Sequence, residues 1–168
     1  HNWGVTSEIG DKPYQEDTFT IIDDLKLFDD IAVPFYAIYD GHAGSACSYY
    51  LKNNFHKHLR YIIKMKNLRK SENFFNDFCK TVQEAIVYTD IHFLDKEKGC
   101  SLHQGSTCIC IFFIGDKVIS CNLGDSLSIL VKKDNYLYLS RDLKPEREKE
   151  RERIIKKNGY ISTDGRIL

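Results

Sequence analysis

Residues 35–44 of the chain, FYAIYDGHAG, join an apolar, aromatic-rich run to an acid, two glycines and a histidine. The apolar run predicts a buried strand, and Asp40 stands where that strand ends. A strand end holds a carboxylate in a fixed position, and Gly41 leaves its backbone carbonyl open to a ligand. The stretch therefore fits a metal site. It fits equally well an ordinary strand-to-helix turn with an acid near the start of the helix.

The sequence after this turn changes to a helical pattern. From Ser45 onward, apolar residues recur every three to four positions, which predicts an amphipathic helix with one apolar face. The residues of that face are Cys47, Leu51, Phe55, Leu59 and Ile62. A second helix is predicted to begin near Ser71. Its apolar face comprises Phe74, Phe75, Phe78, Val82, Ala85, Ile86 and Phe93. Two consecutive helices of this length predict a helical hairpin packed on a sheet.

Segments with strand character lie on both sides of the two helices. Residues 106–114 are almost all apolar or small, as is typical of a strand buried on both faces. Gly115 and Asp116 then predict a tight hairpin. The strands from residue 106 onward are separated by links of two to four residues, which predicts an antiparallel meander. The other strands, besides the one at 33–39, are predicted at residues 3–9, 18–22, 117–123, 127–131 and 136–139.

Residues 146–157 form a highly charged segment between Pro145 and Gly159, residues that commonly mark the start and the end of a helix. Its acids and bases lie at helical pair spacings and balance each other, which favours a solvated surface helix over a nucleic-acid-binding segment. The order of strands, two helices, strands and one helix predicts an α+β fold with antiparallel sheets rather than a parallel βαβ fold.

The composition limits the classes of function. A chain of 168 residues is one domain's worth, and its 24 basic residues equal its 24 acidic residues, so its net charge indicates neither a nucleic-acid nor a membrane partner. No apolar run is long enough to span a bilayer. The six cysteines show no C-x-x-C pair and no zinc spacing. Free thiols in a reducing compartment are favoured over disulfides, so we expect a cytoplasmic or nuclear protein.

Acidic residues stand at three places where predicted strands meet loops: Glu16 with Asp17, Asp40, and Asp125. An acid between apolar strand residues is costly unless it is paired or binds a cation. Oxygen ligands without a His/Cys cluster favour hard ions such as Mg²⁺ or Mn²⁺. Two such ions that share a carboxylate could polarise a water for attack on phosphorus. For each acid taken alone, a turn or capping role is the simpler explanation.

Four motifs, taken in order, carry a resemblance to a known family. They are GDKPYQED at 10–17, YDGHAG at 39–44, GST at 105–107 with NLGDS at 122–126, and LSRDLKP at 139–145 with ERI at 152–154 and Gly159. Together they resemble the metal-dependent Ser/Thr protein phosphatases of the PP2C (PPM) family. The resemblance covers nearly the whole chain. It implies that residues 1–168 are the N-terminal portion of one phosphatase domain, with two antiparallel sheets packed face to face and helices outside each.

The resemblance also implies a binuclear Mn²⁺ or Mg²⁺ centre, with a weaker third metal site. Asp40 would bridge the two ions, Glu16 would ligate one of them, and Gly41 would contribute its carbonyl oxygen. Asp125 would belong to the third site. Asp17 would not bind a metal itself but would contact and orient the residues that do.

Two further residues would act on the substrate. His42 would be the general acid that protonates the leaving Ser or Thr oxygen, while a metal-activated water attacks phosphorus without a phospho-enzyme. A structural hydrogen bond in the turn is the alternative role of His42. Lys12 stands where the family commonly has an arginine that holds the substrate phosphate, and lysine lacks the bidentate fork of arginine. Lys12 is expected to contact phosphate, with a structural role as the alternative.

The chain ends at Leu168 inside a segment that resembles the opening of the family's next motif. The rest of such a domain normally supplies two more metal-binding aspartates, so the 168 residues are expected to form a truncated, inactive domain by themselves. The protein is expected to be a monomeric phosphatase that acts on phosphoproteins. The alternative is a pseudophosphatase that keeps the fold and serves as a binding or regulatory module.

Overall fold

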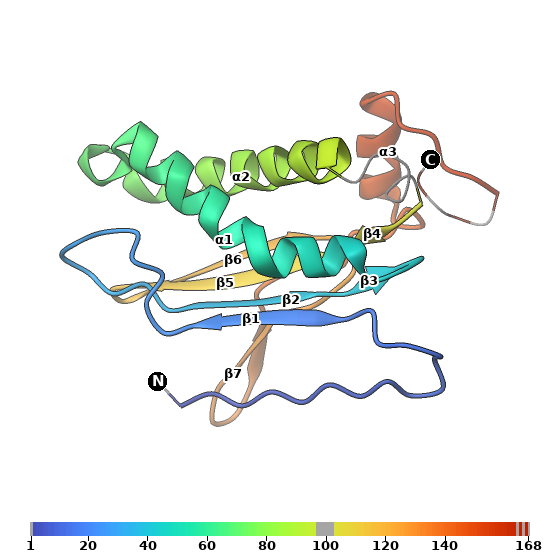
Figure 1. The fold of residues 1–168 in the computed structure, drawn as a ribbon, viewed down its shortest axis with the longest axis horizontal. Coiled ribbons are helices and arrows are strands. Elements are labelled where there is room, and N and C mark those ends of the chain that lie inside the picture. The colour runs from blue at the N-terminus through green and yellow to red at the C-terminus, as the bar shows by residue number, and fades with distance from the viewer. Residues whose placement is uncertain (1, 97–102, 164, 166, 168) are drawn as a thin grey trace.

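The computed structural model describes residues 2–96, 103–163, 165 and 167. At its centre lies a four-stranded antiparallel sheet with the strand order β1-β2-β5-β6 (Figure 1). Its strands are β1 (Thr18–Ile22), β2 (Phe35–Tyr39), β5 (Cys108–Ile114) and β6 (Lys117–Leu123). Helices α1 (Ala46–Lys66) and α2 (Phe74–Lys96), joined by the 3₁₀ turn η1 (Leu68–Lys70), cover one face of this sheet (Figure 1). The predicted helical hairpin on a sheet and the α+β class with antiparallel sheets are confirmed.

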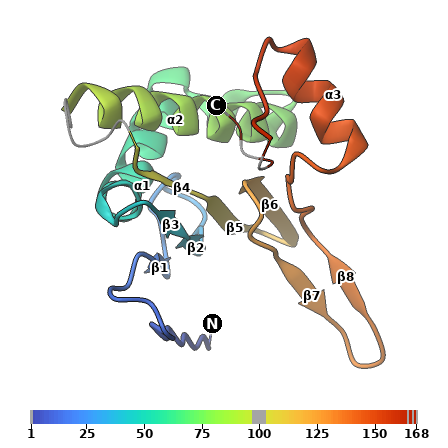
Figure 2. The same ribbon diagram turned by 90° about the vertical axis from the view of Figure 1, so that its right-hand side faces the viewer.

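Two small ribbons and a third helix complete the chain. Strand β3 (Gly41–His42) pairs with β4 (Gly105–Ser106), and β7 (Ile129–Val131) pairs with β8 (Tyr136–Tyr138). Figure 2 shows the β7–β8 ribbon projecting away from the main sheet. The charged segment forms α3 (Glu148–Lys156), as predicted for a surface helix.

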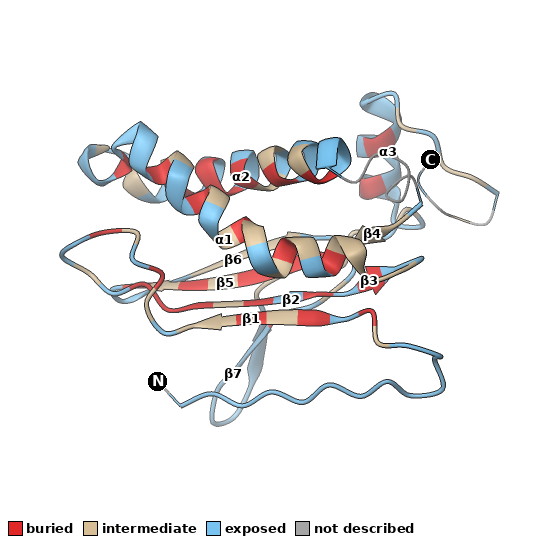
Figure 3. Cartoon of the chain, viewed as in Figure 1, coloured by how far each residue is buried: buried red, intermediate tan, exposed pale blue. Residues whose placement is uncertain are grey.

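The core lies between the helices and the covered face of the sheet. Phe35 of β2 and Phe112 of β5 have ring centroids 5.0 Å apart, and Phe78 of α2 packs edge-on against Phe112 at 5.1 Å. Phe55 of α1 reaches Phe35 at 6.1 Å, and all four rings are fully buried. Figure 3 shows that the buried residues of both helices face the sheet. The apolar faces read from the sequence therefore form the core, which holds the strand ends in place.

Two strand predictions are wrong. Residues 3–9 are extended and exposed but form no strand, because they pair with no neighbouring strand in the described part of the chain. The N-terminal segment instead runs apart from β1 (Figure 1). The meander predicted from residue 106 onward is interrupted after β6, because Gly124 adopts a φ of +98° and redirects the chain. Among the strands that the structure describes, β7 then pairs with β8 alone.

No helix that the structure describes combines the length and the apolar character needed to cross a bilayer. The five described cysteines are free thiols; they are Cys47, Cys79, Cys108, Cys110 and Cys121. Cys100 lies outside the described residues.

Candidate functional site

The candidate site lies at one end of the central sheet. Thr18, the first residue of β1, pairs with Tyr39, the last residue of β2. Asp17 directly precedes Thr18, and Asp40 directly follows Tyr39. The register of this antiparallel pair therefore makes the two acids neighbours just beyond the end of the sheet. The same register argument applies to β5, where Ile109 pairs with Ile38 and brings the start of β5 to the same end.

Thr107 fixes the backbone of Asp40 to the start of β5. The Asp40 amide donates to the Thr107 hydroxyl at 3.1 Å, and the Thr107 amide donates to the Asp40 carbonyl at 2.9 Å. The Thr107 hydroxyl also lies 2.8 Å from the hydroxyl of Ser126. Two of the motifs read from the sequence, at 105–107 and 122–126, are thereby tied to Asp40. We assigned neither hydroxyl a role from the sequence, although both residues lay inside the quoted motifs.

The carboxyl group of Asp40 has a pKa above its ordinary value. Partial burial is the largest cause, the negative charge of Asp17 and a hydrogen bond with it come next, and the charge of Asp125 adds to them. Lys12 acts in the opposite direction. Asp17 and Asp125 therefore act electrostatically on Asp40, and a cation at this place would relieve the repulsion among the three acids.

Glu16 is buried beside these residues, but its carboxylate is directed elsewhere. Its Oε1 accepts a hydrogen bond of 2.6 Å from the amide of Gly44, and its Oε2 lies 3.5 Å from Nζ of Lys12. Its backbone carbonyl accepts a 2.5 Å hydrogen bond from the hydroxyl of Ser48 on α1. Glu16 thus ties the turn after β2 to the start of α1. Lys12, which is exposed, lies close enough to offset part of the negative charge of Glu16 and Asp40.

Gly41 and Gly105 allow the site to pack closely. A Cβ at Gly41 would lie 2.5 Å from the carbonyl oxygen of Glu16, so only glycine fits between β2 and the segment before β1. A Cβ at Gly105 would lie 2.5 Å from Nε2 of His42, because Gly105 pairs with His42 across the β3–β4 ribbon. The His42 ring therefore lies directly on the backbone of Gly105.

His42 is exposed and makes no hydrogen bond to any residue that the structure describes. The alternative role of His42 as a hydrogen-bonding turn residue thus finds no partner in residues 2–96 and 103–163. Its ring is held by contact with Gly105 and is open to solvent, which suits a group that exchanges a proton with a substrate.

Asp125 occupies the outer edge of the site. Its side chain is half exposed, and its Oδ2 lies 3.9 Å from Nζ of Lys144. The loop that carries it is held by Asn122, whose amide group donates to the carbonyl oxygens of Gly124 at 3.0 Å and Arg141 at 2.8 Å. Asn122 is, after Thr107 and Ser126, a third residue to which we gave no role from the sequence.

The donor atoms at this end of the sheet suit a hard cation. They are carboxylate oxygens and one backbone carbonyl, the ligand types that Mg²⁺ and Mn²⁺ prefer. The negative charges of Asp17 and Asp125 contribute to the raised pKa of Asp40, and a bound cation would offset them. No group of three or more His, Cys, Asp or Glu side chains in the described ranges is arranged to hold a metal by itself. The donors fit part of a metal site, and Glu16 is directed away from it.

Comparison with known proteins supplies the family context. A "probable protein phosphatase 2C 11" of Arabidopsis thaliana is 35% identical over 161 residues, and a "probable protein phosphatase 2C 7" of Oryza sativa subsp. japonica is 33% identical over 162 residues. These matches cover 95% and 96% of this chain but 40% of each relative. The chain therefore spans less than half the length of these two relatives.

The fold is shared with solved structures. A serine-threonine phosphatase 2C from Toxoplasma gondii superposes with a TM-score of 0.71 at 19% identity, covering 95% of this chain and 56% of that one. A sex-determining protein of C. elegans superposes with a TM-score of 0.70 at 21% identity, covering 92% and 38%. The family model described as "Protein phosphatase 2C" matches residues 5–168. With that match over nearly its whole length, the chain belongs to the protein phosphatase 2C family.

Proposed function

We propose that the protein containing this chain is a metal-dependent protein Ser/Thr phosphatase, and that residues 1–168 are the N-terminal portion of its catalytic domain. The observation that carries this proposal is the convergence of Asp17, Asp40 and Asp125 at one end of a phosphatase 2C fold. The family consists of protein serine/threonine phosphatases, so phosphoproteins are the proposed substrates. The five described free thiols suit a cytosolic or nuclear protein.

The proposed metal ligands are Asp40, the carbonyl of Gly41 and Glu16, with Asp125 at a weaker third position. To bind a metal, the Glu16 carboxylate would exchange its hydrogen bond with the Gly44 amide for the ion. Bound Mn²⁺ or Mg²⁺ would supply the positive charge that lowers the pKa of a coordinated water and neutralises phosphoryl oxygens. Asp17, hydrogen-bonded to Asp40, keeps that carboxylate oriented.

The remaining residues act on the substrate. Lys12 is exposed 3.5 Å from Glu16, where its ammonium group would attract the phosphate as a point charge. His42, exposed on β3, would deliver a proton to the departing Ser or Thr oxygen. The side chain of a phosphoserine or phosphothreonine could approach both residues from solvent, because neither is covered in the described structure.

The test is hydrolysis of a phosphothreonine peptide by the protein that contains this chain, stripped of metal with EDTA and resupplied with Mn²⁺ or Mg²⁺. We expect turnover to return only with metal, and Asp40→Asn to lower kcat by about a hundredfold or more. We further propose that the 168 residues alone show no turnover, because their described carboxylates do not form a three-ligand group. Metal-independent hydrolysis would contradict the proposal, and a folded protein without hydrolysis would favour the pseudophosphatase alternative.

A further inference from the structure

The basic residues of the chain are unevenly distributed. Residues 41–71, which include α1 and η1, hold seven lysines and arginines and no aspartate or glutamate. The remainder therefore has 17 basic against 24 acidic residues, although the whole chain is neutral. A helix with clustered bases and no acid lacks the stabilising ion pairs between successive turns, so this arrangement is unfavourable for the helix by itself.

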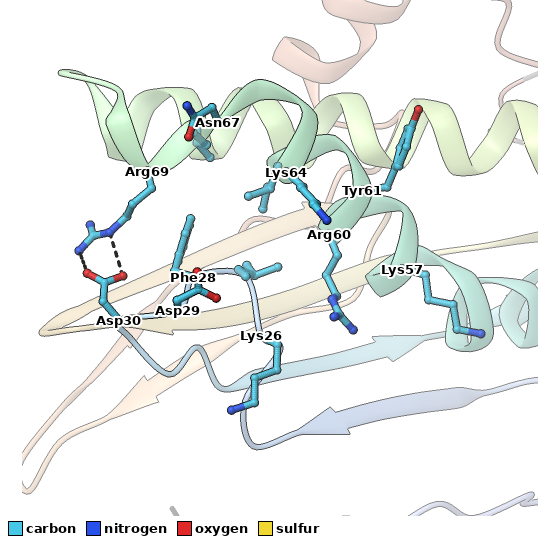
Figure 4. Close-up of a pocket in the computed structure, with 13 residues that line it drawn as sticks. Lys26, Phe28, Asp29, Asp30, Lys57, Arg60, Tyr61, Lys64, Asn67 and Arg69 are labelled. Atoms are coloured by element: carbon cyan, nitrogen blue, oxygen red, sulfur yellow. Dashed lines mark hydrogen bonds and ion pairs between the residues drawn. The ribbon is translucent and has the colours of Figure 1, made fainter.

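Four of these seven bases line one cavity: Lys57, Arg60, Lys64 and Arg69. A cavity of about 800 Å³ lies between the C-terminal half of α1 and the loop that joins β1 to β2. Lys57, Arg60 and Lys64, spaced three and four residues apart, lie on the same side of α1 (Figure 4). Lys26 lies across from them on the loop (Figure 4). The N-terminus of α1 lies beside Glu16 and Gly44, at the candidate metal site. The cavity lies at the C-terminal half of the same helix, so the two are far apart along it.

The loop wall of the cavity is preformed. The Asp24 carboxylate accepts hydrogen bonds from the backbone amides of Lys26 at 2.9 Å and Val33 at 3.2 Å. Leu25 and Phe28 anchor the loop in the core. Asp30 and Arg69 form a bidentate pair across the cavity's end, with Nε–Oδ1 at 3.1 Å and Nη2–Oδ2 at 2.5 Å (Figure 4). A wall fixed in this way needs little ordering when a ligand binds.

The helix wall, by contrast, carries unpaired charge. Lys57, Arg60 and Lys64 are exposed and form no ion pair with any residue in the described ranges. The helix dipole stabilises a basic side chain only in the last turn of a helix. Lys64 lies in the last turn of α1, whereas Lys57 and Arg60 lie before it and gain no such stabilisation. Asp30 pairs with Arg69, and Asp29 on the rim forms no ion pair with any described residue. With five basic and two acidic side chains in its lining, the cavity carries a net positive charge.

We propose that this cavity, with the stripe Lys57, Arg60 and Lys64, is a docking site for an acidic segment of the phosphoprotein substrate. We call it the basic groove. The proposal rests on the proposed phosphatase function. An acidic peptide fits because a groove of several hundred cubic ångströms is large enough for a few side chains. Lys57 and Lys64 are about 10 Å apart along the helix, which matches roughly three residues of an extended peptide.

A membrane or a nucleic acid fits less well. The stripe lines a concave groove, whereas a lipid surface needs a flat or convex face on which to lie. Asp29 on the rim would repel a continuous polyanion such as a nucleic acid. A short acidic segment can avoid this acid.

The geometry also sets the distance between the docked segment and the phosphorylated residue. The stripe lies 11 to 18 residues beyond Ala46, the first residue of α1, which is about 17 to 27 Å along the helix. An extended peptide covers that distance in about five to eight residues. We expect the preferred substrates to carry their acidic cluster at that separation from the phosphoserine or phosphothreonine.

The experiment uses the metal-loaded protein that contains this chain and two phosphothreonine peptides. Each peptide has six Gly/Ser residues after the phosphothreonine, followed by four Glu in one peptide and four Gln in the other. We expect the Glu peptide to have a kcat/KM about five- to tenfold higher, mainly through KM, as three exposed ion pairs would give. The triple variant Lys57→Gln, Arg60→Gln, Lys64→Gln should lose this preference and hydrolyse the Gln peptide normally.

A matched control removes charge elsewhere. Lys132→Gln with Lys133→Gln alters the exposed turn between β7 and β8 and should keep the preference. In parallel, fluorescence anisotropy measures binding of a labelled four-Glu peptide without phosphothreonine, and thermal melts confirm that each variant is folded. Groove-dependent binding without any hydrolysis would support docking and contradict the phosphatase function.

The opposite results overturn docking. Hydrolysis that is equal for the Glu and Gln peptides would leave the phosphatase function intact and contradict the groove proposal. If the Lys132/Lys133 control loses the preference for the Glu peptide to the same extent, the preference arises from the overall charge of the protein and not from the groove. Stripe-dependent binding to phosphatidylcholine–phosphatidylserine vesicles, with none to the peptide, would identify a lipid surface instead.

Discussion

At the scale of single residues, the carboxyl group of Asp40 carries an electrostatic cost in the folded chain. Its pKa is raised by partial burial and by the charges of Asp17 and Asp125. For an acid, a folded pKa above the unfolded value means that the folded state binds the proton more tightly. Stability is therefore lost as the pH rises from the unfolded pKa, 3.8, through the raised folded value, and the loss persists at neutral pH.

We accordingly predict that Asp40→Asn stabilises the metal-free chain at pH 7 by up to about 1 kcal/mol, since solvent screens a partly exposed group, and raises Tm by a few degrees. At a pH below about 3, where Asp40 is protonated, the two proteins should melt alike. Thermal melts of both proteins in EDTA at the two pH values measure this difference. With added Mn²⁺ the wild type should become the more stable protein, because its carboxylate binds a cation that asparagine holds less well. A variant that is less stable than wild type at pH 7 in EDTA would contradict the prediction.

The meeting of the acids could be predicted from the sequence, while the direction of each side chain could not. Asp17 and Asp40 flank strands that pair, so any antiparallel register near the observed one brings them together. The Glu16 carboxylate was expected to point at the metal, but the Gly44 amide holds it. That hydrogen bond depends on how the turn after β2 folds back toward β1, which local sequence patterns do not determine.

At the scale of secondary-structure elements, helices were the easier prediction. The apolar face of α1 was placed at Leu51, Phe55, Leu59 and Ile62. The first three are buried and Ile62 packs partly buried against the core, beside the buried Ile63. Strands depend on partners distant in sequence. Residues 3–9 have a strand's composition, but nothing in their own sequence shows whether a neighbour is present to accept their hydrogen bonds.

The two-residue strands β3 and β4 show how a short element can position a site residue. They join His42 to Gly105 across more than sixty residues of sequence, and the missing side chain of Gly105 leaves the space that the His42 ring fills. Sequence analysis noted the glycine as part of a motif but could not foresee this contact, because the pairing of β3 with β4 is tertiary.

We predict that Gly105→Ala displaces the His42 ring, since the added methyl group would lie 2.5 Å from Nε2. If His42 protonates the leaving oxygen, hydrolysis of a phosphothreonine peptide should fall by about tenfold or more. Hydrolysis of p-nitrophenyl phosphate should fall much less, because p-nitrophenolate leaves without protonation. The His42 ring signals in an NMR spectrum should shift as well, independently of activity.

Gly4→Ala is the matched control, because a Cβ at Gly4 meets nothing within 4 Å. It should leave the hydrolysis rates of both substrates and the His42 ring signals unchanged. Equal losses on the two substrates in Gly105→Ala would indicate general damage to the site and would remove the support for His42 as the acid.

At the scale of the whole molecule, apolar side chains are divided between a buried and an open side. The helices cover one face of the sheet (Figure 3). The opposite face carries a groove of about 210 Å³ lined by residues that include Trp3, Ile38 and Ile129. The β7–β8 ribbon adds Val131, which is 77% exposed, and Tyr138, which is 59% exposed. Such contiguous apolar surface promotes association, and the unpaired edges of the ribbon add to it.

We predict that the 168-residue chain self-associates as its concentration rises and binds the dye ANS, and that Val131→Lys with Tyr138→Lys reduces both. The two side chains are exposed, so the double variant should change Tm by no more than a few degrees. Dynamic light scattering over a concentration series and ANS fluorescence measure the effect. Lys132→Ala with Asp134→Ala, in the adjoining turn, is the matched control and should leave association unchanged. If the lysine variant scatters as strongly as the wild type, the open face does not drive association, and charge repulsion among the chains would be the quantity to test next by varying the salt concentration.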